Sequence, residues 1–254
     1  MVKKIDQTDE DIRQMSSIKI NPDYLLDNFF DYSNVVIRKP WGYEYLIYSN
    51  NQTAVWLLYL KPNFQTSMHA HPNKKTSIII LSGEARVETL SGNHKLNLCH
   101  GLLINKGVFH STTVTSNNGL LVIETETPTN KRDLIRFSDK YGRRGRGYED
   151  EKFYSKLDNK LYQSFNNSKK RYGVEKQFGD CILSLVKFSD SNHLINHTKQ
   201  SKPDILVLLT GNITDGSQTC LLDTGDIISF GDLKKHHSLN PSAENESLLI
   251  KKAV

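Results

Sequence analysis

The sequence predicts an all-β fold in which two similar barrels follow a short helical segment at the N-terminus. Short runs rich in β-branched and aromatic residues, separated by turn residues, fill most of the chain from Val35 onward, as is typical of a sandwich or barrel. The two β-rich halves also share motifs at equal spacing, and such an internal repeat favours one duplicated unit. With 254 residues, the chain is long enough for two small domains.

Residues 1–34 are expected to form the helical segment, packed against a barrel wall. Asp9, Glu10 and Asp11 supply the acidic residues that favour the first turn of a helix. Asn21-Pro22-Asp23 then precede five apolar residues at helical spacing. These are Tyr24, Leu25, Leu26, Phe29 and Phe30.

Residues 35–148 are predicted to form the first barrel and residues 172–254 the second. Between them, residues 149–171 are polar and have little periodicity, so we expect a linker with some helix. The expected strands of the first barrel are Tyr43–Tyr48, Ala54–Leu60, Ser77–Leu81, Ala85–Leu90, Gly101–Asn105 and Leu120–Thr125. Those of the second are Cys181–Phe188, Ile205–Leu209, Cys220–Leu222, Ile227–Phe230 and Leu248–Lys251.

Composition excludes several classes of protein and partner. No apolar run approaches the roughly 20 residues needed to cross a membrane, so no membrane partner is expected. The polar N-terminus and only three cysteines suit a cytoplasmic protein. The net charge of +5 comes without a basic stripe carrying stacking aromatics, so no nucleic acid is expected as a partner.

The most informative motif lies between Asn63 and His110. His69 and His71 are two residues apart on an expected strand, so their side chains point the same way and could hold one ion. His110, in a Gly-x-x-His turn on a later strand, would complete a three-histidine set with open coordination positions. Such a set suits Zn, Fe(II), Mn or Ni.

Along the chain, His-x-His is followed by Ser82-Gly83 and then by Gly107-x-x-His110. This pattern resembles that of cupins. Arg38–Glu44, with the sequence Arg-Lys-Pro-Trp-Gly-Tyr-Glu, is similar to the first strand of the cupin domain in type II mannose-6-phosphate isomerases. Asp133–Arg143, ending in Asp-Lys-Tyr-Gly-Arg, resembles the closing segment of that domain. The resemblance therefore implies cupin barrels, a metal site and chemistry on a phosphorylated sugar.

Two positions depart from that family's pattern. Ser67 stands where the family has a Gln, and Thr76 stands where it has a Glu, and both lost groups are expected metal ligands. His69, His71 and His110 remain a credible imidazole site. The alternative is that these histidines line a polar pocket or bind a ligand directly as donors.

The candidate catalytic residues are Glu124 and Lys75. Glu124 and Glu126 alternate along a strand and so face the same side of the sheet, where Glu124 could act as a base or as a metal ligand if that side is the barrel interior. If that side faces solvent, neither has a catalytic role. Basic residues suit an anionic carbohydrate, and the candidate substrate-binding residues are Lys74, Arg136, Tyr141 and Arg143.

The second half carries a weaker version of the motif. His197 is as far from Gly211 as His69 is from Gly83. In the same register, Asp204 matches Thr76, and His237 or its neighbour His236 matches His110. A second site of His197, Asp204 and His237 is one interpretation. The other is that this half has degenerated to a scaffold or dimerisation unit.

The leading functional hypothesis is a metal-dependent isomerase or epimerase of a sugar phosphate or nucleotide sugar, used in polysaccharide biosynthesis. An Fe(II)-dependent dioxygenase is the second hypothesis, since open histidine sites also activate oxygen. A non-enzymatic sugar-binding or regulatory cupin is the third, and the changes at Ser67 and Thr76 favour it. By analogy with cupins, a homodimer is expected.

Overall fold

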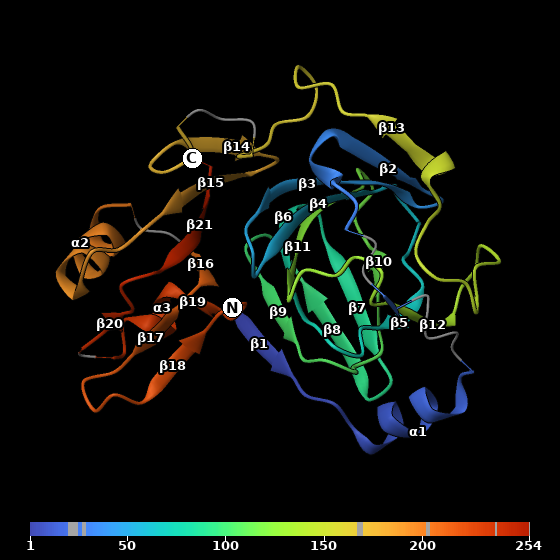
Figure 1. Ribbon diagram of the computed structural model, residues 1–254, viewed down its shortest axis with the longest axis horizontal. Coiled ribbons are helices and arrows are strands. Elements are labelled where there is room, and N and C mark those ends of the chain that lie inside the picture. The colour runs from blue at the N-terminus through green and yellow to red at the C-terminus, as the bar shows by residue number, and fades with distance from the viewer. Residues whose placement is uncertain (20–24, 27–28, 167–169, 202–203, 237, 254) are drawn as a thin grey trace.

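A computed structural model describes residues 1–19, 25–26, 29–166, 170–201, 204–236 and 238–253 (Figure 1). Four β-sheets dominate these residues, so the prediction of an all-β fold is confirmed. The first half of the chain forms an eight-stranded sheet that faces a five-stranded sheet, and the second half forms another five-stranded sheet and a three-stranded sheet. No helix among the described residues is long and apolar enough to cross a membrane.

The eight-stranded sheet has the order β1-β9-β6-β11-β4-β3-β2-β13. Its strands are β1 (Val2–Ile5), β2 (Val35–Lys39), β3 (Gly42–Ser49), β4 (Ala54–Leu60), β6 (Lys75–Ser82), β9 (Gly101–Ile104), β11 (Leu120–Thr127) and β13 (Tyr154–Lys156). The facing sheet has the order β12-β5-β10-β7-β8. Its strands are β5 (Met68–Ala70), β7 (Ala85–Thr89), β8 (Gly92–Leu96), β10 (His110–Val114) and β12 (Ile135–Ser138).

The second half is built in the same way from fewer strands. Its five-stranded sheet has the order β14-β15-β21-β16-β19, and its three-stranded sheet has the order β18-β17-β20. The strands are β14 (Glu175–Phe178), β15 (Cys181–Val186), β16 (Ile205–Thr210), β17 (Asn212–Thr214), β18 (Cys220–Asp223), β19 (Ile227–Ser229), β20 (Asn240–Pro241) and β21 (Glu246–Lys252). A separate apolar core fills the space between these two sheets.

The run of apolar residues in β6 is explained by burial on both faces of the sheet. Ile78 and Ile80 point into the first barrel, whereas Ile79 and Leu81 point outward. The outward residues join a core that also contains Leu183, on the five-stranded sheet of the second half. This core therefore joins the two halves, in addition to the separate core inside each of them.

The helices are short, and the two that begin at Asp9 and Ser191 lie at the outer edge of the molecule (Figure 1). The helical elements are α1 (Asp9–Ser17), α2 (Ser191–Ser201), α3 (Phe230–Leu233) and the 3-10 turns η2 (Tyr32–Asn34) and η3 (Glu151–Phe153). α1 contains the acidic turn that the sequence indicates, and Thr8 caps it. The second N-terminal helix was expected around Tyr24, which lies outside the described residues.

Two strands lie in segments that were expected to be helix or linker. β1, within residues 1–34, pairs in parallel with β9 and becomes an edge of the eight-stranded sheet. β13, within residues 149–171, pairs antiparallel with β2 at the other edge. Both are short segments whose backbone groups are satisfied by a partner strand distant in sequence, which local periodicity does not reveal.

Candidate metal centre

Three histidines converge inside the first barrel. His69 on β5 lies directly opposite His110 on β10, because these residues are partners in the antiparallel pairing. His71 is two residues beyond His69 and therefore points to the same side. The ligand atoms of the three side chains all lie within 4.8 Å of one another.

The hydrogen bonds of the three rings leave one nitrogen of each ring available for a metal. Each Nδ1 contacts a backbone carbonyl oxygen: His69 contacts Ser67 at 2.8 Å, His71 contacts Asp133 at 2.6 Å and His110 contacts Val108 at 3.0 Å. Because a carbonyl oxygen only accepts, each Nδ1 donates, and the lone pair remains on Nε2. The Nε2 atoms of His71 and His110 are buried without a hydrogen-bond partner among the described residues. This donor set fits a divalent transition metal.

Burial keeps the three rings neutral, which is the protonation state that binds metal. Desolvation, assisted by neighbouring positive charge, holds the pKa values of His69 and His71 well below their usual range. Desolvation also lowers the pKa of His110, to about 4.

Glu124 lies beside the histidines and titrates near neutral pH. It is on β11, and its Oε1 is 3.7 Å from Nε2 of His71. Burial raises the pKa of Glu124 to about 7, against the opposing effect of Lys131. A carboxyl group with such a pKa suits proton transfer, because it can both accept and release a proton at neutral pH.

Glu126, two residues further along β11, has a different environment. Lys74 and Lys131 each place Nζ 3.0 Å from its Oε1, and the indole N–H of Trp56 donates to Oε2 at 3.2 Å. Burial alone would raise the pKa of Glu126, but the two lysines outweigh it and lower the pKa. Glu126 is therefore a fixed negative charge, whereas Glu124 is the titrating group.

The carboxylate of Glu149 lines the histidine cavity, where it pairs with three cationic side chains. Glu149 contacts Arg136 at 2.9 Å and Arg143 at 2.6 Å, and it also pairs with Lys39. Arg143 additionally binds Asp139 at 2.7 Å. The cavity that remains beside the histidines has a volume of about 50 Å³.

The structure distributes the predicted substrate-binding residues unevenly. Arg136 and Arg143 line the histidine cavity. Lys74 is also close by but is wholly buried, with Nζ bound to Glu126 and to the carbonyl of Asn130. The hydroxyl of Tyr141 donates to the carbonyl of Gln65 at 3.0 Å, so it anchors a loop.

Lys75 is not at the histidine site, which corrects its expected place. As the neighbour of the inward-facing Thr76, it points to the opposite face of the sheet. Its Nζ forms an ion pair with Asp226 of the second half at 2.8 Å. Thr76 has a buried hydroxyl without a hydrogen-bond partner among the described residues, where the resembling family has a Glu.

The described residues of the second half do not assemble a comparable site. His197 lies on helix α2, and not on a strand as its match to His69 implied. Asp190 favours a helix there, since its carboxylate accepts from the backbone N–H of His193 at 2.8 Å near the helix start. Asp204 accepts from the backbone N–H of Lys252 at 2.9 Å, and His237 lies outside the described residues.

Sequence reasoning missed three charged residues that shape the cavity: Glu44, Lys131 and Glu149. Lys131 lies 3.3 Å from Glu44, which also accepts from the hydroxyl of Tyr148. Lys131 and Lys39 outweigh the effect of burial and lower the pKa of Glu44 to about 2. One signal of this cluster is present in the sequence: Glu44 is the single acidic residue in the aromatic run Tyr43–Tyr48. A charged residue is rarely buried unless it is paired, so Glu44 indicates a buried cationic partner.

No model of a known protein family matches the chain, and no curated protein matches it. Solved structures similar to it include a protein with a double-stranded beta-helix domain from Klebsiella pneumoniae, with 15% identity and a TM-score of 0.35 over 47% of this chain and 94% of that one. An RmlC-like cupin from Shewanella frigidimarina has 16% identity and a TM-score of 0.35, covering 39% and 88%. The capsular polysaccharide assembling protein CapF from Staphylococcus aureus has 15% identity and a TM-score of 0.38, covering 43% and 36%.

These TM-scores all lie below 0.5, so the chemistry of the site is inferred from its own residues.

Proposed function

We propose that the chain is a metal-dependent enzyme that isomerises or epimerises a sugar phosphate or a nucleotide-linked sugar in polysaccharide biosynthesis. The observation that carries this proposal is the convergence of three neutral imidazoles beside the buried carboxyl group of Glu124, whose Oε1 lies 3.7 Å from Nε2 of His71. His69, His71 and His110 would hold the ion through their Nε2 atoms. When bound, a divalent metal supplies Lewis acidity that polarises a substrate carbonyl or hydroxyl oxygen.

Glu124 is the group that moves the proton. In an isomerisation, its carboxylate accepts a proton from the carbon next to the carbonyl and returns it to the carbonyl carbon, while the proton of the adjacent hydroxyl passes to the carbonyl oxygen. The substrate is thereby rearranged without an external oxidant or reductant. Glu126 remains ionised throughout, held by Lys74 and Lys131.

Arg136 and Arg143 would bind the anionic group of the substrate. They now share the carboxylate of Glu149, so an incoming phosphate has to replace that carboxylate. A phosphate offers these guanidinium groups a doubly charged and bidentate partner, which favours the exchange. The displacement of Glu149 also enlarges the cavity, whose volume of about 50 Å³ is too small for a sugar ring.

The first test is the metal content of the purified protein, measured by elemental mass spectrometry after removal of any tag. We expect near-stoichiometric metal in the natural sequence and in the control variant His94→Ala, whose histidine lies on β8 outside this cluster. In His71→Ala and in His110→Ala we expect the metal content per protein to fall about tenfold or more. Protein that stays empty after incubation with Zn, Mn, Ni and anaerobic Fe(II) would contradict the proposal.

The second test measures proton transfer directly. Mannose 6-phosphate and fructose 6-phosphate are incubated with the metal-loaded protein in deuterated water, and deuterium at the carbon next to the carbonyl is followed by proton NMR. Glu124→Gln should keep its metal and lose the exchange by about 100-fold or more, the usual contribution of a general base. Equal exchange in Glu124→Gln and in the natural sequence would remove Glu124 from its proposed role.

The small cavity favours one other candidate function. A volume of about 50 Å³ beside three histidines admits a diatomic gas more readily than a sugar, as in an Fe(II)-dependent dioxygenase. That activity would appear as oxygen consumption by the anaerobically Fe(II)-loaded protein in the presence of its substrate. An isomerase would instead work equally well without oxygen.

A further inference from the structure

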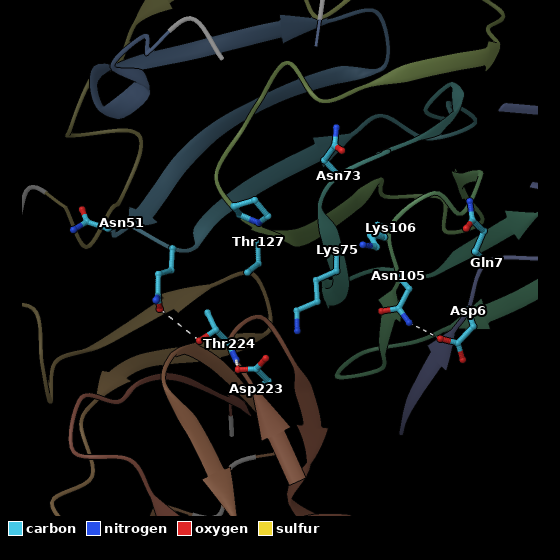
Figure 2. A pocket seen from close by; sticks show the side chains of 12 residues that line it. Asp6, Gln7, Asn51, Asn73, Lys75, Asn105, Lys106, Thr127, Asp223 and Thr224 are labelled. Carbon is cyan, nitrogen blue, oxygen red and sulfur yellow. Dashed lines mark hydrogen bonds between the residues drawn. The ribbon is translucent and has the colours of Figure 1, made fainter. Parts of the chain in front are cut away.

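A second and larger cavity lies where the two halves of the chain meet (Figure 2). Its volume is about 780 Å³, and we call it the junction cleft. The loops β3–β4, β5–β6, β9–β10 and β11–β12, all at one end of the first barrel, line it on one side. The β18–β19 turn of the second half lines it on the other side. Among the residues that the structure describes, none lines both this cleft and the histidine cavity.

Direct contacts between the two halves hold the junction cleft in shape. Lys75 pairs with Asp226 at 2.8 Å, and the hydroxyl of Thr53 donates to the carbonyl of Leu209 at 2.8 Å. Gly225 has a φ of +87°, and a Cβ added there would lie only 2.5 Å from Oγ1 of Thr127. The turn therefore approaches the barrel as closely as glycine permits, and the cleft is a preformed feature.

The lining of the junction cleft is polar and nearly neutral. Five side-chain amides line it, from Gln7, Asn51, Gln52, Asn73 and Asn105. Thr127 and Thr224 add hydroxyl groups, and Figure 2 shows Thr224 on the turn opposite Asn51 and Lys75. Lys75 and Lys106 are balanced by Asp6 and Asp223, and none of the described residues that line the cleft is aromatic.

This chemistry selects the class of ligand. An amide both donates and accepts hydrogen bonds, as a sugar hydroxyl does, so a surface rich in amides matches a polyhydroxylated molecule. The absence of aromatic side chains from the lining disfavours a flat apolar ligand, and the two aspartates disfavour a strongly anionic one. The volume falls within the range of about 300 to 1,000 Å³ that small-molecule sites occupy.

We propose that the junction cleft binds a neutral saccharide longer than one sugar ring, independently of the histidine site. The barrel loops and the β18–β19 turn contact the ligand from opposite sides. The site does not depend on the proposed isomerase activity, because it shares no lining residue with the histidine cavity. A chain acting on sugars at one site would thereby hold a neutral glycan at another.

The proposal is tested on the full-length, isotope-labelled protein by two-dimensional amide NMR. The probes are the neutral trisaccharides maltotriose, mannotriose and N-acetylchitotriose, with glucose 6-phosphate and inorganic phosphate as charged comparators. We expect at least one trisaccharide to shift the amides of Asn51, Asn105 and Thr224 saturably, with a dissociation constant of about 1 mM or tighter. The shifts should persist in EDTA and in His71→Ala.

Asn51→Trp places a bulky side chain on the β3–β4 loop and should raise the dissociation constant of the trisaccharide about tenfold or more. Asn118→Trp is the matched control, since Asn118 lies before β11 at the opposite end of the barrel, and it should bind normally. The proposal would be overturned by the absence of a saturable shift with any trisaccharide, or by shifts at the same amides with phosphate compounds alone. Loss of the response in His71→Ala or in EDTA would also overturn it, by placing the ligand at the metal.

Discussion

Lys131 balances the buried charges of the first barrel. Its Nζ lies 3.0 Å from Glu126 and 3.3 Å from Glu44, and it sits 3.8 Å above the ring of Trp56. Removing one partner of a buried ion pair leaves an uncompensated charge, which typically costs about 3 to 5 kcal/mol. We therefore expect Lys131→Met to lower the free energy of unfolding by about that amount, measured by urea denaturation.

The matched control for that measurement is Lys95→Met. Lys95 pairs with Glu84 at 3.7 Å on the surface, where ion pairs contribute about 0 to 1 kcal/mol. A loss of stability in Lys131→Met no larger than that in Lys95→Met would show that Lys74 and Lys39, the other partners of Glu126 and Glu44, suffice to balance these carboxylates.

The sequence predicts a residue's place well where strand alternation decides it. His69 and His71 could be paired from their spacing alone, and Glu124 and Glu126 could be placed on one face of a strand. Lys75 was misplaced because a one-residue shift on a strand reverses the direction of the side chain. Glu149 was missed because it reaches the cavity from a segment without regular structure, about 80 residues from His69.

Helix α1 supports the loop that carries His110. The carboxylate of Asp11, which is 1% exposed, accepts from the backbone N–H of Phe109 at 2.9 Å. It also accepts from the backbone N–H of Thr8 at 2.9 Å and from its hydroxyl at 2.7 Å, as part of the capping box. One side chain therefore both starts the helix and fixes the residue that precedes His110.

We expect Asp11→Ala to destabilise the protein by about 1 to 3 kcal/mol, since it leaves buried donors without an acceptor. Thermal unfolding measures this loss. Asp9→Ala is the control, because Asp9 begins the same helix, is exposed, and should change stability by about 0.5 kcal/mol or less. Similar melting temperatures for the two variants would indicate that water replaces the carboxylate of Asp11.

At the scale of an element, the sequence distinguishes strands from helices less well in the second half. The repeat placed His197 by counting residues from Gly211, which presumes that both halves have the same elements between these points. In the structure this interval begins with helix α2, whose Leu194 is fully buried. The segment Ser191–His197 is polar apart from Leu194 and Ile195, so its helical period is too weak to predict the helix.

The two halves of the molecule are joined by apolar packing and by a polar cluster around Glu246. The carboxylate of Glu246, on β21, accepts from the amide of Asn50 at 2.9 Å and from the hydroxyl of Tyr48, both in the first barrel. It also accepts from the hydroxyl of Tyr172, and it pairs with Lys187 at 3.2 Å, both in the second half. Burial would raise the pKa of Glu246, but the tyrosine and asparagine hydrogen bonds outweigh it and lower the pKa to about 2.

This lowered pKa makes the stability of the whole molecule depend on pH. A carboxyl group whose pKa is lower in the folded state stabilises the fold above its ordinary pKa, and this contribution disappears as pH falls through the folded value. For Glu246 the loss should run from about pH 5 to about pH 2. We expect Glu246→Gln to be less stable than the natural sequence at neutral pH by about 1 to 3 kcal/mol, typical of hydrogen bonds to a charged group.

The difference in the free energy of unfolding between Glu246→Gln and the natural sequence should shrink toward zero as the pH is lowered, because Glu246 itself becomes protonated. Urea unfolding at several pH values between neutral and pH 3 measures it, with Glu175→Gln as the control. Glu175 pairs with Lys251 at 2.6 Å on the surface of the second half alone, so its removal should matter little at any pH. A constant difference between Glu246→Gln and the natural sequence across this range would mean that Glu246 stabilises the junction by its shape alone, and that its charge contributes nothing.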